Sequence, residues 1–159
     1  MGSAAEAPLP IVIEPMRVAD VDAVMEVERR SFPTPWSRHA FMAELLDNDR
    51  AHYMVARLPV ETGGAVVGYI GLWLIAGEGH ITNVAVHPDY RGRGVGRRLL
   101  EAAVELCRSR SARRMTLEVR VSNLVAQRLY RNMGFVSAGI RRGYYRDNNE
   151  DAIIMWKDL

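Results

Sequence analysis

Hydrophobic positions recur along this chain with two different spacings, and each change of spacing marks a new element. Hydrophobic residues three and four positions apart predict about four helices. These helices begin near Asp20 or Asp22 and near Ser37, and cover residues 97–108 and 124–133. Shorter alternating or continuously apolar stretches predict seven strands. The strands occupy residues 11–17, 53–58, 65–75, 80–86, 115–119, 135–140 and 152–156.

The order of these elements predicts the fold class. One strand, two helices, three strands, a helix, a strand, a helix and two strands follow one another. This order predicts an α/β (α+β) domain with a mixed sheet, antiparallel at first and with a parallel strand–helix–strand step later. No repeat or linker interrupts residues 11–159, which are therefore predicted to form a single domain. Residues 1–10, rich in alanine and proline, are predicted to be a flexible tail.

Composition adds three limits to this picture. The chain has 159 residues, 48% of them hydrophobic, and a net charge of +2, which suits one packed domain and does not demand an anionic partner. The only cysteine, Cys107, cannot form an internal disulfide and lies on the apolar side of its helix, which favours a core position and a cytoplasmic setting. No apolar run reaches the ~18 residues of a membrane span, so no membrane partner is expected.

The strongest candidate chemistry lies where the strand at residues 84–86 runs through a turn into a helix. The turn reads Arg91-Gly92-Arg93-Gly94-Val95-Gly96. Glycines let a ligand approach the backbone, and the first amides of a helix lack internal partners, so the turn predicts a phosphate site. Its spacing matches neither a nucleotide triphosphate loop nor the dinucleotide fingerprint. A solvated arginine turn, or a segment that contacts RNA, is the alternative.

This turn resembles the pyrophosphate loop of the GNAT superfamily of N-acetyltransferases, whose pattern is Gln/Arg-x-x-Gly-x-Gly/Ala. The order of elements is also similar to that fold over residues 11–159. The resemblance implies a seven-stranded sheet with splayed central strands and acetyl-CoA as the co-substrate. It further implies that a bulge in residues 84–86 separates two strands, and that the Val86 amide is the donor to the thioester oxygen. The cofactor-binding residues implied in this way are Val84, Ala85, Val86, Arg91, Gly92, Arg93, Gly94, Val95, Gly96 and Arg97.

Three further residues have ordinary interpretations when each is taken alone. Glu118 is a single acid in an otherwise apolar strand and faces away from Leu117 and Val119, which indicates a carboxylate in water or paired with an arginine. Asn123 alone indicates a helix cap. Tyr130 alone indicates a half-buried helix aromatic.

Taken together, these residues resemble the bacterial RimI branch of the superfamily, the ribosomal-protein-alanine N-acetyltransferases. The similar segments are residues 32–33, 35–37, 117–120, 122–123, 129–130, 133–135, 141–145 and 150–155. The resemblance implies that Glu118 is the general base, Tyr130 the general acid and Asn123 a cofactor ligand. The chemistry agrees, because an α-amine with a pKa of ~8 must lose a proton before it attacks, and a carboxylate can take that proton.

The sequence offers three candidates for the acceptor pocket. Trp36 is a candidate wall or a core anchor, and Tyr144 and Tyr145 are candidates for binding a peptide backbone or ordinary hairpin aromatics. Surface charge is the preferred interpretation of four acids, Glu28, Asp147, Glu150 and Asp151. His80 and His87 have no partner at metal-ligand spacing and are interpreted as structural or exposed, so no metal is expected.

The RimI resemblance implies that the acceptor is the N-terminal alanine of the eighteenth protein of the small ribosomal subunit, without direct binding to nucleic acid. Three other functions stay open at this point. One is a GNAT enzyme that acetylates a lysine side chain or a small amine. Another is an RNA-binding module that uses the arginines at residues 91–98 and 108–114. The third is a CoA-binding scaffold without catalysis.

Overall fold

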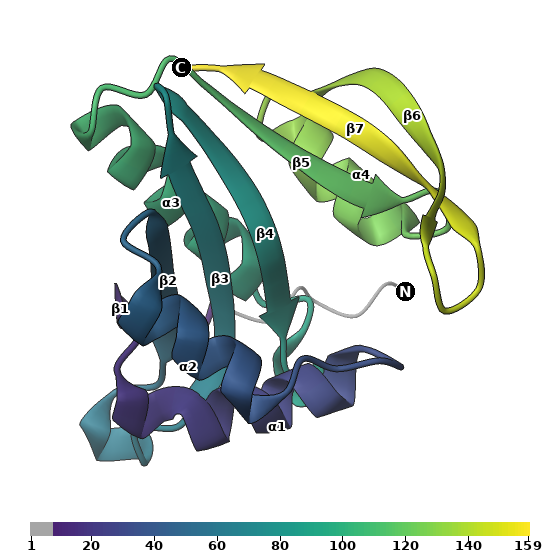
Figure 1. The fold of residues 1–159 in the computed structure, drawn as a ribbon. Helices are drawn as coiled ribbons and strands as arrows, with labels where there is room; N and C mark the ends of the chain where they lie inside the picture. Colours follow the sequence, from purple (N-terminus) through teal and green to yellow (C-terminus); the bar gives the residue numbers. More distant parts are fainter. Residues whose placement is uncertain (1–7) are drawn as a thin grey trace, which may run out of the picture.

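A computed structural model describes residues 8–159, and the part of the predicted tail at residues 1–7 lies outside them. Seven strands form one mixed sheet in the order β1-β2-β3-β4-β5-β7-β6 (Figure 1). The strands are β1 (Val12–Pro15), β2 (Ala51–Arg57), β3 (Val66–Ile75), β4 (Glu78–Val86), β5 (Arg114–Arg120), β6 (Val136–Tyr145) and β7 (Glu150–Asp158). The helices are α1 (Val21–Ser31), α2 (Arg38–Asp47), α3 (Val95–Ser109) and α4 (Leu124–Asn132). The predicted mixed seven-stranded fold is thus confirmed.

The helix ends follow local chemistry that the sequence already contains. The Ser37 hydroxyl accepts a hydrogen bond from the Ala40 amide at 3.1 Å, which caps the first turn of α2. After α4, Gly134 has a φ of +93°, a left-handed conformation that ends a helix at little cost for glycine. Among the described residues, no helix is long and apolar enough to cross a bilayer.

Helices cover the two faces of the sheet and create two cores. On one face α3 buries its apolar side, which includes Leu99, Ala103 and Cys107, so the predicted core position of Cys107 is confirmed. On the other face α1 and α2 pack Val24 and Phe41 against β2 and β3. Leu46, an apolar residue of α2, is not part of this core, because it is 62% exposed.

The central strands β4 and β5 separate soon after they meet. Their parallel pairing covers only Glu78–His80 against Arg114–Thr116, and the two strands then diverge as a V (Figure 1). The register of β4 against β3 shifts at Thr82, which lies opposite no residue of its own and forms a bulge. The bulge was predicted within residues 84–86, but it lies two residues earlier, at Thr82. It bends β4 at the start of the gap.

The N-terminal end of the domain begins earlier than predicted. Leu9 is 9% exposed and belongs to the core under α3, and its amide donates a hydrogen bond to the Arg93 carbonyl at 3.4 Å. A leucine that loses its contact with water in this way is held in place. The assignment of residues 8–10 to a flexible tail is therefore wrong at Leu9.

Candidate active site

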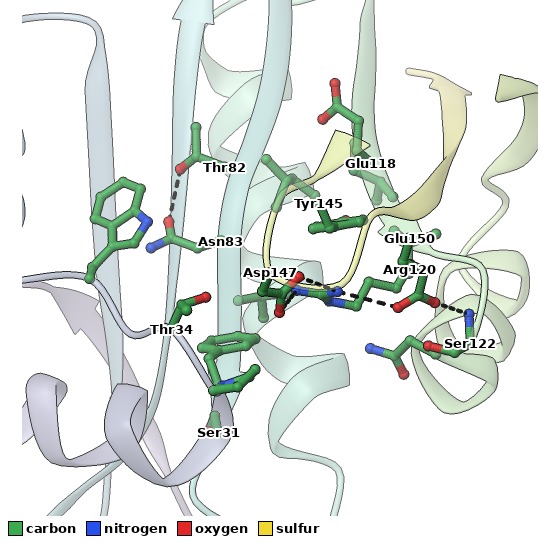
Figure 2. A pocket seen from close by; sticks show the side chains of 18 of the residues that line it. Ser31, Thr34, Thr82, Asn83, Glu118, Arg120, Ser122, Tyr145, Asp147 and Glu150 are labelled. Carbon is green, nitrogen blue, oxygen red and sulfur yellow. Dashed lines mark hydrogen bonds and ion pairs between the residues drawn. The ribbon is translucent and has the colours of Figure 1, made fainter. Parts of the chain in front are cut away.

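Two pockets meet in the gap between β4 and β5. The hairpin pocket, about 690 Å³, lies between the segment after α1 and the turn that joins β6 to β7 (Figure 2). The glycine-loop pocket, about 550 Å³, lies between β4, the turn before α3, and α4. Residues that border both pockets are Ser31, Phe32, Val84, Asn123 and Tyr130. The shared border means that ligands in the two pockets would meet at this point.

The glycine-loop pocket is shaped by glycines in left-handed conformations. Gly92 has a φ of +76° and Gly94 a φ of +80°, and a Cβ on either would meet nothing within 4 Å. Glycine is thus required there by the backbone angle rather than by crowding. The Arg98 amide donates the first helical hydrogen bond, to the Gly94 carbonyl at 3.0 Å. The amides of Val95 and Gly96, one turn earlier, have no helical acceptor and are available to an anion.

All but one of the predicted cofactor residues border this pocket. The border includes Val84, Ala85, Val86, Arg91, Gly92, Gly94, Val95, Gly96, Arg97 and Asn123. Arg93 does not border it, and the Arg93 carbonyl instead accepts the amide of Leu9. Arg93 lies between two glycines in left-handed conformations, and its position relative to the pocket cannot be predicted from the motif alone.

The backbone of β4 directs amides into the gap. The His87 amide donates to the Val67 carbonyl of the β3 side at 2.8 Å. Because strand residues alternate, the Val86 amide and carbonyl point away from β3. The Val86 carbonyl indeed accepts from the Arg91 Nε at 2.9 Å, on the side of the glycine loop. The Val86 amide is therefore directed toward the region that β5 has left.

Glu118 projects from β5 into the hairpin pocket. Its carboxylate is 10% exposed, and Oε2 lies 2.7 Å from the Nε2 atom of His80, while Oε1 lies 3.6 Å from the Nε atom of Arg141. Burial by itself raises the pKa of Glu118, but the hydrogen bond and charge of His80, with the charge of Arg141, lower it below its usual value. Glu118 is thus an ionised carboxylate at neutral pH, with an imidazole in direct contact.

His80 is a site residue that sequence reasoning placed among structural or exposed residues. It occupies the last position at which β4 and β5 still pair, opposite Thr116. Its side chain consequently lies at the apex of the gap, beside Glu118. A polar residue at the start of an apolar strand was the available signal, but only the register between β4 and β5 brings the two side chains together.

Tyr130 lies on α4 at the border of both pockets. Its ring is 6% exposed and packs edge-on against Phe135 at 6.0 Å between centroids. Its hydroxyl makes no hydrogen bond to any residue in the described range 8–159. Burial raises the pKa of Tyr130, so the hydroxyl keeps its proton throughout the physiological range. Tyr130 can therefore donate a proton or a hydrogen bond to a group in either pocket.

Asn123 is the cap of α4, and its predicted role as a cofactor ligand stays a prediction. Its Oδ1 atom accepts from the Ala126 amide at 3.1 Å and so caps α4. The same residue borders both pockets. The cap orients the side chain, and the Nδ2 group remains available to a bound molecule.

Among the residues predicted for the acceptor pocket, Tyr144 differs from the prediction. Trp36 and Tyr145 border the hairpin pocket, and Trp36 also packs on Phe41 at 5.4 Å between centroids, so it is both wall and anchor. Tyr144 borders neither pocket, is 44% exposed and lies beside Arg141. The two tyrosine rings pack edge-on against each other at 5.1 Å between centroids, and only Tyr145 of the pair lines the pocket.

The interpretation of Glu28 as a surface charge is also wrong, because the residue is only 2% exposed. Its carboxylate accepts hydrogen bonds from the Trp36 amide, at 2.8 Å, and from the Tyr69 hydroxyl. Burial raises the pKa of Glu28 above its usual value although both hydrogen bonds oppose this change. Glu28 thereby ties the wall of the hairpin pocket at Trp36 to the core.

Comparison with known proteins assigns the family. The profile of the Acetyltransferase (GNAT) family matches residues 21–135. The chain belongs to this family. It is 35% identical over 145 residues to the [ribosomal protein bS18]-alanine N-acetyltransferase of Escherichia coli (strain K12), covering 90% of this chain and 94% of that protein. A Bacillus subtilis (strain 168) protein, named as a candidate for the same activity, is 49% identical over 141 residues, covering 89% and 91%.

The solved structures agree with this assignment. The crystal structure of the ribosomal-protein-S18-alanine N-acetyltransferase from Escherichia coli superposes with a TM-score of 0.84 and 32% sequence identity, covering 94% of each chain. The GNAT fold and the RimI resemblance predicted from the sequence are confirmed, and the chain is an N-acetyltransferase of a family that uses acetyl-CoA.

Proposed function

We propose that this enzyme transfers the acetyl group of acetyl-CoA to the N-terminal alanine of the small-subunit ribosomal protein bS18. The observation that carries the proposal is the meeting of the glycine-loop pocket and the hairpin pocket beside Tyr130, with Glu118 in the second of them. The relatives named for this activity cover nine-tenths of the chain, which supports the same acceptor. The enzyme would meet a ribosomal protein in the cytoplasm. A free cysteine, Cys107, agrees with such a reducing compartment.

The glycine-loop pocket has the chemistry that a CoA diphosphate requires. The first residues of α3, together with Arg91 and Arg97, border it, so amide donors and positively charged residues lie at the same cavity. The Val86 amide would donate to the thioester oxygen as that oxygen gains negative charge. When bound, acetyl-CoA supplies the activated acetyl group.

Glu118 and Tyr130 would carry the proton transfers. An α-amine with a pKa of ~8 is largely protonated at neutral pH, and the ionised Glu118 would take its proton directly or through a water molecule. His80, in contact with Glu118, would orient the carboxylate. Tyr130, kept neutral by burial, would donate to the departing thiolate sulfur.

Direct attack by the amine needs no enzyme nucleophile, and the one thiol does not offer one. Cys107 is fully buried, and burial raises its pKa to about 11. A thiol with such a pKa is almost entirely protonated at neutral pH. Transfer in one step, with both substrates held together, is therefore the proposed route.

Acetyl transfer to synthetic peptides tests the acceptor. The panel contains the N-terminal decapeptide of bS18, versions that begin with serine, methionine or glycine, and an N-terminally blocked version with an internal lysine. We expect the alanine peptide to give the highest kcat/KM and the blocked peptide to give none. Equal acetylation of the blocked lysine peptide would instead support a lysine acetyltransferase, and CoA binding without transfer to any amine would support a scaffold.

A further inference from the structure

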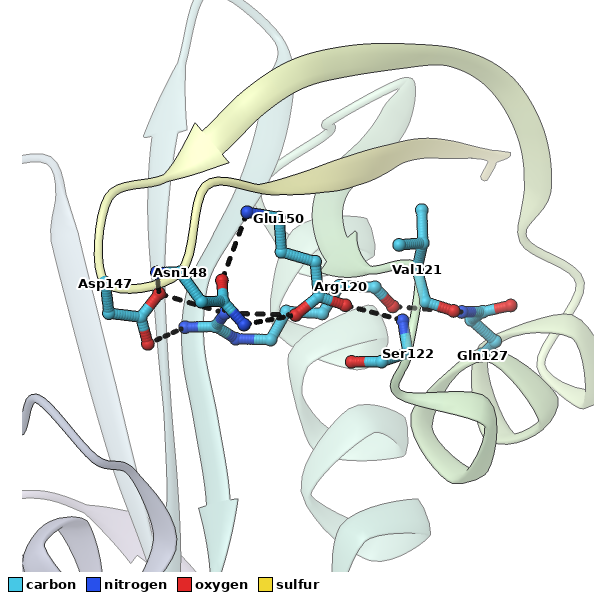
Figure 3. Close-up of polar contacts among 7 residues, drawn as sticks. All are labelled: Arg120, Val121, Ser122, Gln127, Asp147, Asn148 and Glu150. Atoms are coloured by element: carbon cyan, nitrogen blue, oxygen red, sulfur yellow. Dashed lines mark hydrogen bonds and ion pairs between the residues drawn. The ribbon is translucent and has the colours of Figure 1, made fainter.

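Arg120 joins several groups around the hairpin pocket (Figure 3). It lies on β5 two residues after Glu118, so both side chains leave the same face of the strand. Its Nη1 and Nη2 atoms donate to the two oxygens of the Asp147 carboxylate at 3.1 and 2.9 Å. Nη1 also lies 3.2 Å from the Oδ1 atom of Asn148 and from the Oε1 atom of Glu150. One guanidinium thus binds three residues at the turn between β6 and β7.

The same guanidinium also orients an aromatic wall of the pocket. The Arg120 Cζ atom lies 4.0 Å from the centroid of the Tyr145 ring, a cation–π contact. Glu150 extends the cluster, because its second oxygen accepts the Ser122 amide at 2.7 Å. The turn is therefore attached to the strand that bears Glu118 and to the segment that leads to Asn123.

These contacts are partly sheltered, and the other hydrogen bonds of the turn are local, from the Asn148 amide to Asp147 and from the Glu150 amide to Asn148. The side chains of Arg120, Asp147 and Glu150 are 24%, 15% and 12% exposed, so their ion pairs are less screened than ordinary surface pairs. By contrast β6 is the edge strand of the sheet, and most of its residues are exposed. An edge hairpin with few buried contacts opens easily unless specific interactions hold it.

We propose that Arg120 is a positioning residue that preforms the acceptor wall of the hairpin pocket. It acts through Tyr145, Asp147 and Asn148, all of which border the pocket, by holding them at a constant distance from Glu118. Figure 2 shows Tyr145 and Asp147 on the side of the pocket opposite Thr34 and Asn83. The inference rests on the proposed function, because it assigns the hairpin pocket to the acceptor. A preformed wall lowers the ordering cost of binding a protein chain end.

Substitutions at Arg120 test this role. Arg120→Met removes the charge, and Arg120→Lys keeps the charge but loses the planar fork and the stacked guanidinium. For both variants we expect the KM of the bS18 peptide to rise about tenfold or more while the KM of acetyl-CoA stays within about twofold of the wild-type value. Hydrogen exchange of the amides at residues 145–150, without any ligand, should become faster in both variants.

The same strand supplies a matched control in Arg114. Its guanidinium pairs with Glu78 at 2.5 Å and stacks on Trp156 at 4.3 Å, which repeats the chemistry of Arg120 at the other end of β5. Arg114 borders neither pocket. Arg114→Met and Arg114→Lys should leave both KM values and the exchange of residues 145–150 unchanged.

The outcomes separate this inference from the proposed function. Faster exchange of the turn together with a raised peptide KM supports the role of Arg120. Unchanged hydrogen exchange in the Arg120 variants overturns the role of Arg120, and so does faster exchange with an unchanged peptide KM. In either case the proposed function still stands if the wild-type enzyme acetylates the peptide. A wild-type enzyme that does not acetylate the peptide overturns the proposed function, and this inference with it.

Discussion

At the scale of single residues, the site depends on how neighbours control two protons. Glu118 is held ionised by His80 and Arg141 despite its burial, whereas Tyr130 is held neutral because its ring is buried without a charged partner. Such opposite effects on neighbouring groups are what a base and an acid require within one pocket. The base role of Glu118 and the acid role of Tyr130 each predict the effect of one substitution.

Glu118→Gln should lower kcat by about 10²-fold or more, because a carboxamide cannot accept the amine proton. The loss should be largest below pH ~8, where most of the amine is still protonated, and should shrink as the pH rises through the pKa of the amine. Steady-state rates from pH 6 to 10 measure this. Glu105→Gln, on the exposed side of α3, is the matched control. Equal rates for Glu118→Gln and wild type across that range would remove Glu118 as the base.

Tyr130→Phe should slow the transfer by roughly 10²-fold, because the departing thiolate loses its proton donor. The ring remains buried, and the hydroxyl has no partner among the described residues, so the melting temperature and the Kd for CoA should change little. Differential scanning calorimetry and calorimetric titration measure these quantities. A variant that turns over normally would exclude Tyr130 as the acid.

At the scale of elements, two irregularities create the site. The bulge at Thr82 bends β4 away from β5, and the left-handed glycines turn the chain from β4 into α3. Regular elements would have closed the sheet and left no gap. Gly79 shows the opposite requirement, because a Cβ there would overlap the Cys107 sulfur where β4 packs on α3.

Gly94→Ala separates the backbone role of the loop from general stability. A left-handed alanine costs about 1–2 kcal/mol, so the free energy of unfolding should fall by about this amount. Gly64→Ala is the control, because Gly64 has a φ of +66°, equally open surroundings and a position outside both pockets. Both variants should lose similar stability in urea, but only Gly94→Ala should bind CoA more weakly. Equal CoA affinity in the two variants would contradict the phosphate role of the loop.

At the scale of the whole molecule, the sheet forms two parts that diverge around the site. Strands β1 to β4 with α1, α2 and α3 make one part, and β5, β7 and β6 with α4 make the other (Figure 1). A ligand in the gap would contact both parts, since Val84 and Tyr130 border the same pocket from opposite sides. Binding should therefore stabilise the entire fold.

CoA at about 100 times its Kd should add about 2.7 kcal/mol to the free energy of unfolding, because only the folded chain contains the pocket. For a chain of this length the melting temperature should rise by about 5–10 °C. Thermal unfolding with and without CoA measures the change, with sodium sulfate at equal ionic strength as the control. No rise with CoA, or an equal rise with sulfate, would contradict specific binding at the glycine loop.

The amino-acid sequence by itself determined the elements, their order and the glycine loop, because these depend on local spacing and on residues a few positions apart. The site roles of Glu118, Asn123 and Tyr130 were predicted only through the resemblance of their strand–helix segment to the RimI branch. Only the tertiary structure placed His80 beside Glu118, buried Glu28, and excluded Tyr144 and Arg93 from the pockets. These outcomes depend on the register between strands distant in sequence and on which face each side chain takes. The order of residues along the chain does not reveal that register, because the register is set only when the sheet forms and β4 and β5 separate.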